Sequence, residues 1–194
     1  MPTLHVLIAS IGRQSLQGML DSILPFLLED DHVTIVFDGV EPTVNAQELQ
    51  TQTKGTVHIH HELFALGFWG HGVRNKYNAL LERTDFVLHA DDDDTYKPDA
   101  FRIIREECKD VKNLYIMKLH NVTRNTYVPP LHCNKIENTN IGTPCGIIPY
   151  ELNMKGIWGC FYGGDFAFYE SIAHLADSVV FSDSVIYAYN CRWY

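Results

Sequence analysis

The sequence has no long apolar run and no basic targeting segment. Its longest purely apolar stretches, such as residues 23–28, are far shorter than the roughly 20 residues that cross a bilayer. The chain runs directly into an apolar segment from Leu4, without the basic region and small-residue cleavage site of a secretory signal. No membrane span is therefore predicted, and the expected location is the cytoplasm.

Basic residues are also scarce. The chain has 15 Lys and Arg against 24 Asp and Glu, a net charge of -9, and its basic residues are scattered. Because polyanion binding needs clustered Lys and Arg, nucleic acid is excluded as a partner. Five cysteines form an odd number without CxxC spacing, which favours reduced thiols in the cytoplasm. The histidines show no spacing typical of a zinc site.

Apolar segments alternate with helical patterns along the chain. Short apolar runs predict strands, and apolar positions repeating every three to four residues predict helices. The expected strands are residues 4–9, 33–37, 57–59, 86–90, 114–119 and part of 179–189. The expected helices are residues 15–28, which Pro25 should kink or shorten, 73–83, 98–108, and one introduced by residues 163–165 that ends near 176. This order is typical of an α/β fold with a mainly parallel sheet between helices.

The middle of the chain has a different texture. Residues 121–150 are rich in Asn, Thr, Pro and Gly and have few periodic apolar positions, so we expect a long irregular segment with a short edge strand at 146–148. Loops of this length usually bind something. With 46% hydrophobic residues, the 194 residues can bury one sizeable core, and a single domain over 1–194 is expected.

Four consecutive aspartates, Asp91, Asp92, Asp93 and Asp94, follow directly on the apolar run 86–90. They are therefore expected at the carboxyl end of a buried strand, where α/β sheets bind ligands. Two carboxylates about 4 Å apart repel by roughly 1 kcal/mol in water and by several times more inside a protein. Mg²⁺ or Mn²⁺, which prefer oxygen ligands, would relieve this repulsion and hold phosphates there. The alternative is a solvated acidic turn.

The segments around the aspartates resemble a known family. Residues 74–81, the strand with its aspartates at 86–94, and residues 96–99 are similar in order and spacing to the Arg-Asn helix, the DxD motif and the Pro-Asp helix start of GT-A glycosyltransferases, especially family 2. Residues 4–13, 33–39 and 158–165 resemble further elements of that family. The resemblance implies a GT-A fold, with a nucleotide-binding half at about 1–100 and an acceptor-side half at about 101–194, in a small form similar to those of large algal viruses.

The resemblance also implies a donor site. Asp93 would bind Mn²⁺ or Mg²⁺ and through it the donor diphosphate, with Asp91 as the second metal residue. Asp91, or Asp92 in its place, would hold the ribose hydroxyls or a metal-bound water. Asp38 would accept a hydrogen bond from the imide N–H of uracil, although Asp38-Gly39 alone also fits an ordinary turn. The other implied donor-binding residues are Ser10, Arg13, Arg74, Asn75 and Trp158. Arg13 alone fits a surface charge equally well, and for Asp94 a solvated or capping role is preferred.

Asp165 is the candidate catalytic base. An inverting transferase needs a carboxylate within hydrogen-bond reach of the acceptor hydroxyl, and the preceding Gly163 and Gly164 allow a close approach of the sugar. The alternative is an N-cap of the following helix. Trp158, Phe161 and Tyr162 could form a sugar-stacking wall, or belong to the core.

The aspartates also fit three other kinds of protein. Asp91-x-Asp93-x-Thr95 also matches the nucleophile motif of haloacid dehalogenase-like phosphatases, but that motif normally ends the first strand, whereas three strands precede it here. A calcium-binding EF-hand loop fails because its twelfth position is Arg102 instead of glutamate. A domain that binds glycan without catalysis is the third. The prediction is a metal-dependent, inverting glycosyltransferase that uses a nucleotide sugar, expected to be a UDP-sugar, and a glycan or glycoconjugate acceptor.

Overall fold

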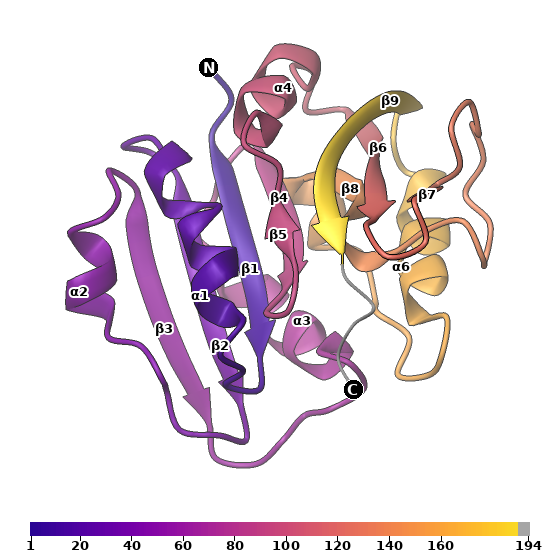
Figure 1. The fold of residues 1–194 in the computed structure, drawn as a ribbon. Coiled ribbons are helices and arrows are strands. Elements are labelled where there is room, and N and C mark those ends of the chain that lie inside the picture. The colour runs from indigo at the N-terminus through magenta and orange to yellow at the C-terminus, as the bar shows by residue number, and fades with distance from the viewer. Residues whose placement is uncertain (190–194) are drawn as a thin grey trace.

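Four parallel strands form the first half of the sheet in the computed structural model, which describes residues 1–189 (Figure 1). They are β1 (Leu4–Ser10), β2 (His32–Asp38), β3 (Thr56–Glu62) and β4 (Phe86–Asp91), in the order β3-β2-β1-β4. All seven residues of β1 are buried, as expected for a parallel strand that is covered on both faces.

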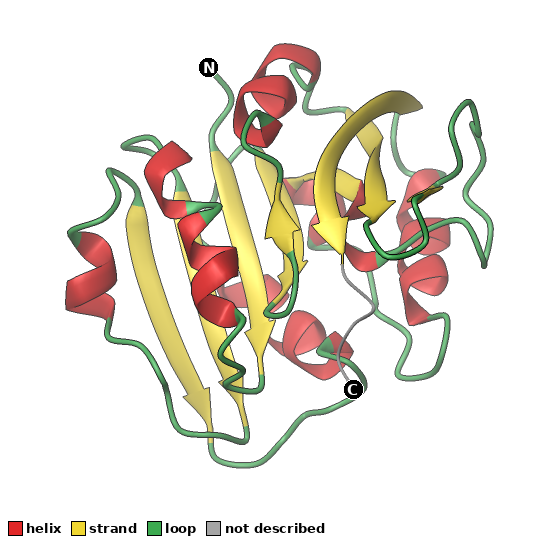
Figure 2. Cartoon of the chain, in the orientation of Figure 1, coloured by secondary structure: helices red, strands yellow, loops and turns green. Residues whose placement is uncertain are grey.

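Helices cover both faces of these strands (Figure 2). Side chains alternate across a strand, so Leu7 and Ile8 of β1 point to opposite faces. Ile8 belongs to the cluster that includes α1 (Leu16–Asp21), whereas Leu7 belongs to a second cluster with α3 (His71–Tyr77). The shorter elements of this half are the 3-10 turns η1 (Leu24–Phe26) and η2 (Asn78–Leu80) and helix α2 (Ala46–Gln50).

The second half continues the same sheet in the order β4-β8-β6-β9-β5. Here β8 (Gly146–Pro149) is antiparallel to β4 and β6 (Asn113–Asn121), while β9 (Ser178–Tyr189) is parallel to β6. The remaining elements are β5 (Thr95–Tyr96), β7 (Thr126–Val128), η3 (Thr143–Cys145), and helices α4 (Ala100–Glu107), α5 (Tyr150–Asn153) and α6 (Gly164–Ala173). The predicted α/β class with a mainly parallel sheet is confirmed.

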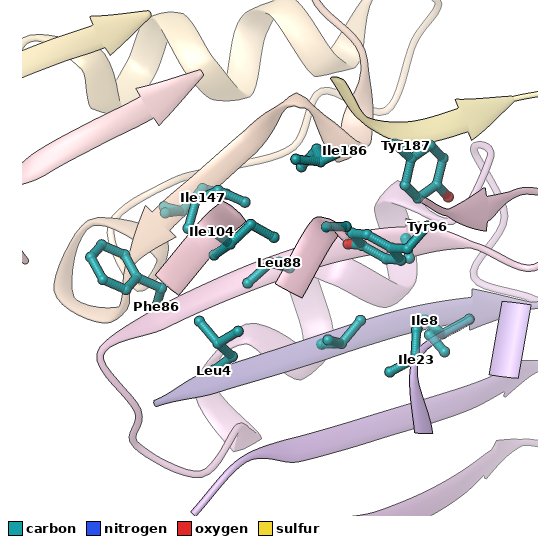
Figure 3. Packing of buried hydrophobic residues seen from close by; sticks show 14 of the residues in the cluster. Leu4, Ile8, Ile23, Phe86, Leu88, Tyr96, Ile104, Ile147, Ile186 and Tyr187 are labelled. Atoms are coloured by element: carbon teal, nitrogen blue, oxygen red, sulfur yellow. The ribbon is translucent and has the colours of Figure 1, made fainter. Parts of the chain in front are cut away.

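One apolar cluster joins the two halves (Figure 3). Leu4 and Ile8 of β1 and Phe86 and Leu88 of β4 belong to it together with Ile147, Ile186 and Tyr187 of β8 and β9, and each of these side chains is at most 1% exposed. The carboxyl ends of β1 and β4 are thereby fixed relative to the second half.

Several sequence predictions need correction. The helix expected over 15–28 ends at Asp21, and Pro25, which lacks a backbone N–H, lies in the separate turn η1. The helix expected over 73–83 begins at His71 and ends at Tyr77. The strand expected at an edge is β8, which lies inside the sheet between β4 and β6 with all four residues buried. Helix α2 and strand β5 were not predicted, because each is short and largely polar in sequence.

No helix within residues 1–189 is long and apolar enough to cross a membrane. Cys108, Cys133, Cys145 and Cys160 are all free thiols. Cys191 lies outside the described residues.

Candidate active site

The carboxyl ends of β1, β2 and β4 open onto a cavity of about 850 Å³, called here the strand-end cavity. It is lined from the first half by Ser10, Arg13, Asp38 and all four consecutive aspartates, and from the second half by Thr143, Tyr162 and Asp165. A second cavity of about 830 Å³ lies near Met1, Phe26 and Phe101. Because parallel sheets bind ligands at the carboxyl ends of their strands, the strand-end cavity is the candidate site.

Asp92 is buried and holds the loop after β1. Its Oδ2 accepts hydrogen bonds from Ser10 Oγ at 2.7 Å and from the Ile11 N–H at 2.9 Å, and its Oδ1 accepts one from Arg13 Nη1 at 2.6 Å. The Asp92 side chain is 1% exposed. Ser10 and Arg13, two residues predicted to bind the donor, are thus hydrogen-bonded to Asp92, a third one.

Asp91 is tied to a buried arginine. Arg74 of α3 is fully buried, and its Nη2 donates to Asp91 Oδ1 at 2.5 Å and to the Ala90 carbonyl at 3.1 Å. The Asp91 backbone N–H donates to Tyr187 Oη of β9. A buried guanidinium needs such a partner, because an unpaired buried charge costs several kcal/mol. Arg74 therefore fixes Asp91 at the cavity wall, and Asp91 remains 32% exposed there.

Asp93 is the more loosely held carboxylate. It lies 3.2 Å from Arg13 Nη1 and is 22% exposed. Burial, with the neighbouring Asp91 and Asp92, raises the pKa of Asp93, although Arg13 opposes this. This is the situation that a divalent cation would relieve.

The donor set fits Mg²⁺ or Mn²⁺ held partly by substrate. Within residues 1–189 no group of three or more His, Cys, Asp or Glu side chains forms a metal site by itself. Mg²⁺ is commonly bound by one or two carboxylates together with substrate phosphates, instead of by an all-protein cage. Asp91 and Asp93, both exposed to the strand-end cavity, satisfy that requirement.

Asp38, at the end of β2, holds the loop before α3. Its Oδ1 accepts from the Leu66 N–H at 2.6 Å and its Oδ2 from the Gly67 N–H at 2.9 Å, and the residue still lines the cavity. Each carboxylate oxygen keeps a second lone pair. Asp38 can therefore accept a further hydrogen bond from an N–H group of a nucleotide base.

The loop that Asp38 holds is strained. Gly67, Phe68, Trp69 and Gly70 have φ angles of 70°, 55°, 54° and 81°, four consecutive residues in the left-handed region. A left-handed conformation costs about 1–2 kcal/mol for each residue with a side chain. Asp38 holds the start of this loop, and Arg74 Nη1 donates to the Trp69 carbonyl at its end. Strain of this kind clusters at functional sites.

This loop brings Trp69 beside Tyr162. The two rings meet edge to face at 6.4 Å, both line the strand-end cavity, and they are 69% and 91% exposed. Tyr162 was predicted from the sequence as a stacking residue, whereas Trp69 was not. The neighbouring Gly67 and Gly70 were the available signal, since both are typical of an irregular, tightly turned loop.

Asp165 lies within α6 and does not cap it. The N-cap is Gly163, and the Asp165 carboxylate instead accepts from Thr143 Oγ1 at 2.6 Å while lying 3.1 Å from His71 Nε2. These hydrogen bonds outweigh burial and lower the pKa of Asp165. The carboxylate is therefore ionised and faces the cavity. His71 and Thr143 were not predicted from the sequence, because they lie in distant segments that only the fold brings together.

Three residues predicted to bind the donor lie outside the cavity lining: Asn75, Trp158 and the buried Arg74. Trp158 is 1% exposed, with its ring stacked on Phe168 at 4.0 Å, so it belongs to the core. Asn75 donates to the Trp158 carbonyl and accepts from its N–H, and thus fixes the backbone there. Phe161 is 58% exposed but is likewise not part of the lining.

The chain matches no protein-family model, and its sequence matches no curated protein. Solved structures do share its architecture, and they define the class: the protein has the GT-A fold of glycosyltransferases. Residues 1–349 of S. aureus TarS superpose with a TM-score of 0.73 at 17% identity, covering 98% of this chain and 60% of that one. The same TarS fragment bound to UDP-GlcNAc gives 0.73 at 17% identity, over 100% and 60% of the two chains.

A second neighbour is the mannosyltransferase PcManGT from Pyrobaculum calidifontis, in complex with GDP-Man and Mn²⁺. It gives a TM-score of 0.69 at 15% identity and covers 96% of this chain and 56% of that one. The present chain thus spans about three fifths of the length of these structures. At such identities the likeness establishes the fold.

Proposed function

We propose that the protein is a metal-dependent glycosyltransferase that moves a sugar from a nucleotide-sugar donor to a hydroxyl of a glycan or glycoconjugate. The observation that carries this proposal is the strand-end cavity, where a carboxylate pair suited to a metal and diphosphate faces a separate ionised carboxylate. The fold neighbours bound to UDP-GlcNAc, and to GDP-Man with Mn²⁺, support a nucleotide-sugar donor.

The donor half is assigned by charge. Asp91 and Asp93 would hold Mn²⁺ or Mg²⁺, which when bound stabilises the negative charge that develops on the departing diphosphate. Asp38 would accept a hydrogen bond from the imide N–H of uracil. The proposed donor is therefore a UDP-sugar. Arg74 would keep Asp91 in place, and Asp92 would hold the loop after β1 through its hydrogen bond from the Ile11 N–H.

The acceptor half centres on Asp165. In an inverting transfer, Asp165 would take the proton of the acceptor hydroxyl while that oxygen forms a bond to the anomeric carbon. The bond from the anomeric carbon to the phosphate oxygen breaks, and its electron pair stays on the nucleoside diphosphate. The exposed Trp69 and Tyr162 rings offer faces on which the apolar side of a sugar can stack. This pair supports a carbohydrate acceptor.

The test is a donor screen with matched variants. Purified protein is incubated with UDP- and GDP-linked sugars, with and without Mn²⁺, and nucleoside diphosphate release is measured. Asp93→Asn should lose metal-dependent donor binding, whereas Asp94→Asn should keep most of it. Asp165→Asn should keep donor affinity and lower transfer on the order of a hundredfold or more. Phosphomonoester hydrolysis abolished by Asp91→Asn, with no use of any nucleotide sugar, would replace this function by a phosphatase.

A further inference from the structure

His71 connects the candidate base to the backbone of the preceding segment. Its Nδ1 lies 2.7 Å from the Gly159 carbonyl oxygen, and its Nε2 lies 3.1 Å from Asp165 Oδ1. A carbonyl oxygen only accepts hydrogen bonds, so Nδ1 carries a proton. A neutral imidazole would then present a bare lone pair at Nε2 to an ionised carboxylate. Two acceptors facing each other at this distance repel, so a second proton is needed.

We propose that His71 is a doubly protonated positioning residue that holds Asp165 ionised, with one carboxylate oxygen fixed and the other directed to the acceptor hydroxyl. Both contacts of the carboxylate, from His71 and Thr143, are made to Oδ1. No described residue makes a hydrogen bond to Oδ2. The catalytic part of this inference rests on the proposed function, whereas the protonation state of His71 and Asp165, called here the His71–Asp165 pair, does not.

The backbone and side chains around His71 are packed closely against it. A Cβ at Gly164 would lie 2.0 Å from the Gly159 carbonyl oxygen and 2.5 Å from His71 Nδ1, so only glycine permits this approach. The His71 side chain is 5% exposed, and its ring packs 5.4 Å from the Trp158 ring. The Gly163-Gly164-Asp165 sequence therefore admits His71 as well as starting α6.

Three buried titratable groups near His71 and Asp165 are Cys145, Tyr169 and His89. Burial raises the pKa of Cys145 to about 12 and that of Tyr169 well above its ordinary value, and it lowers the pKa of His89 to about 3. Arg74 is the charged neighbour, and its positive charge also lowers the pKa of Asp165. Within residues 1–189, the carboxylate that lies within ion-pair distance of the His71 ring is Asp165.

Helix α3 thereby links the two halves of the site. His71 contacts Asp165 on the acceptor side, and Arg74, three residues later on the same face of the helix, contacts Asp91 on the donor side. The pair extends the pH range of the base downward, because an adjacent cation favours the ionised carboxylate. The transferred proton goes to Oδ2, and His71 keeps both of its own.

Replacing His71 by Asn or by Gln tests the hydrogen bonds of its two ring nitrogens one at a time. In His71→Asn the shorter amide can donate to the Gly159 carbonyl but does not reach Asp165, whereas in His71→Gln the longer amide can donate to Asp165. The first experiment uses no substrate: long-range ¹H–¹⁵N spectra of the His71 ring and a ¹³C titration of the Asp165 carboxyl. We expect both ring nitrogens to be protonated at pH 7, and the Asp165 midpoint to move to higher pH in His71→Asn.

The second experiment is the pH profile of nucleoside diphosphate release with UDP-GlcNAc and Mn²⁺. His71→Asn should lower the rate about tenfold, less than loss of the base itself, and should move the acid limb to higher pH. His71→Gln should recover part of the rate. A singly protonated His71 ring at pH 7, or an Asp165 midpoint unchanged in a folded His71→Asn, would overturn the proposal. Absence of turnover with any nucleotide sugar, with both spectra as expected, would refute the proposed function and leave the pair intact.

Discussion

Asp92 should stabilise the fold more than it binds ligand, and Asp92→Ala is the variant that shows this. The substitution removes the acceptor of three hydrogen bonds, from Ser10 Oγ, the Ile11 N–H and Arg13. The Ser10 hydroxyl and the Ile11 N–H lose their partner at a buried position, because the Asp92 side chain is 1% exposed. A buried donor left unpaired costs about 1–3 kcal/mol.

The magnitude follows from burial. The Arg13 side chain is 42% exposed, so its ion pair with Asp92 adds only about 0–1 kcal/mol after solvent screening. Together with the two unpaired donors, the free energy of unfolding should fall by about 4 kcal/mol. For a chain of this size the melting temperature should then drop by about 8–16 °C.

Thermal and urea unfolding measure the effect, with Asp93→Ala as the matched control. Asp93 is more exposed, and among residues 1–189 its side chain pairs with Arg13 at 3.2 Å. Its removal should therefore change the free energy of unfolding by less than about 1 kcal/mol. If Asp92→Ala melted within about 2 °C of the parent, Asp92 would not be the tie that holds the loop after β1.

Three further predictions concern pH, acceptor binding and packing. His5 is stacked on His32 and fully buried, and burial lowers its pKa to about 4, so the folded protein keeps it neutral down to that pH. Its contribution to the free energy of unfolding is therefore complete above pH 6.5, the ordinary pKa of histidine, and is lost as the pH falls towards 4. Chemical unfolding of His5→Gln should show about 2 kcal/mol less loss of stability between pH 8 and pH 5 than the parent. Trp69→Ala should raise the acceptor KM about fivefold with donor affinity unchanged, whereas Phe64→Ala, exposed but outside the cavity lining, should not; equal effects would refute the stacking role. Gly164→Ala should destabilise the fold by about 1–3 kcal/mol through its clash with the Gly159 carbonyl, and an unchanged melting temperature would contradict that packing.

Local patterns were enough to predict the strands that build the site. The continuous apolar runs of β1, β2 and β4 predict that these strands are buried, and the carboxyl ends of parallel strands lie at a common edge of the sheet. Ser10, Asp38 and the aspartate run therefore lie around one cavity, as their positions after the strands suggested. The position of β8 inside the sheet was not predictable in this way, because strand order depends on pairing between distant segments.

The individual tasks of adjacent aspartates are not local information. Strand alternation ends at Asp91, and the turn that follows buries Asp92 while leaving Asp93 partly exposed. Trp158 and Trp69 show the same limit. An aromatic residue next to glycines can face the core or the solvent, and packing against Phe168 decides the first case. The metal, base and donor roles remain predictions.

The central claim is that the strand-end cavity binds a nucleoside diphosphate through a divalent cation. Calorimetric titration of UDP in the presence of Mn²⁺, and again with EDTA, tests it most directly, with the parent protein and Asp93→Asn compared. The account predicts binding by the parent that EDTA abolishes and that Asp93→Asn lacks, although this variant should melt like the parent. Equal UDP affinity with and without EDTA, or full metal-dependent affinity in Asp93→Asn, would contradict it.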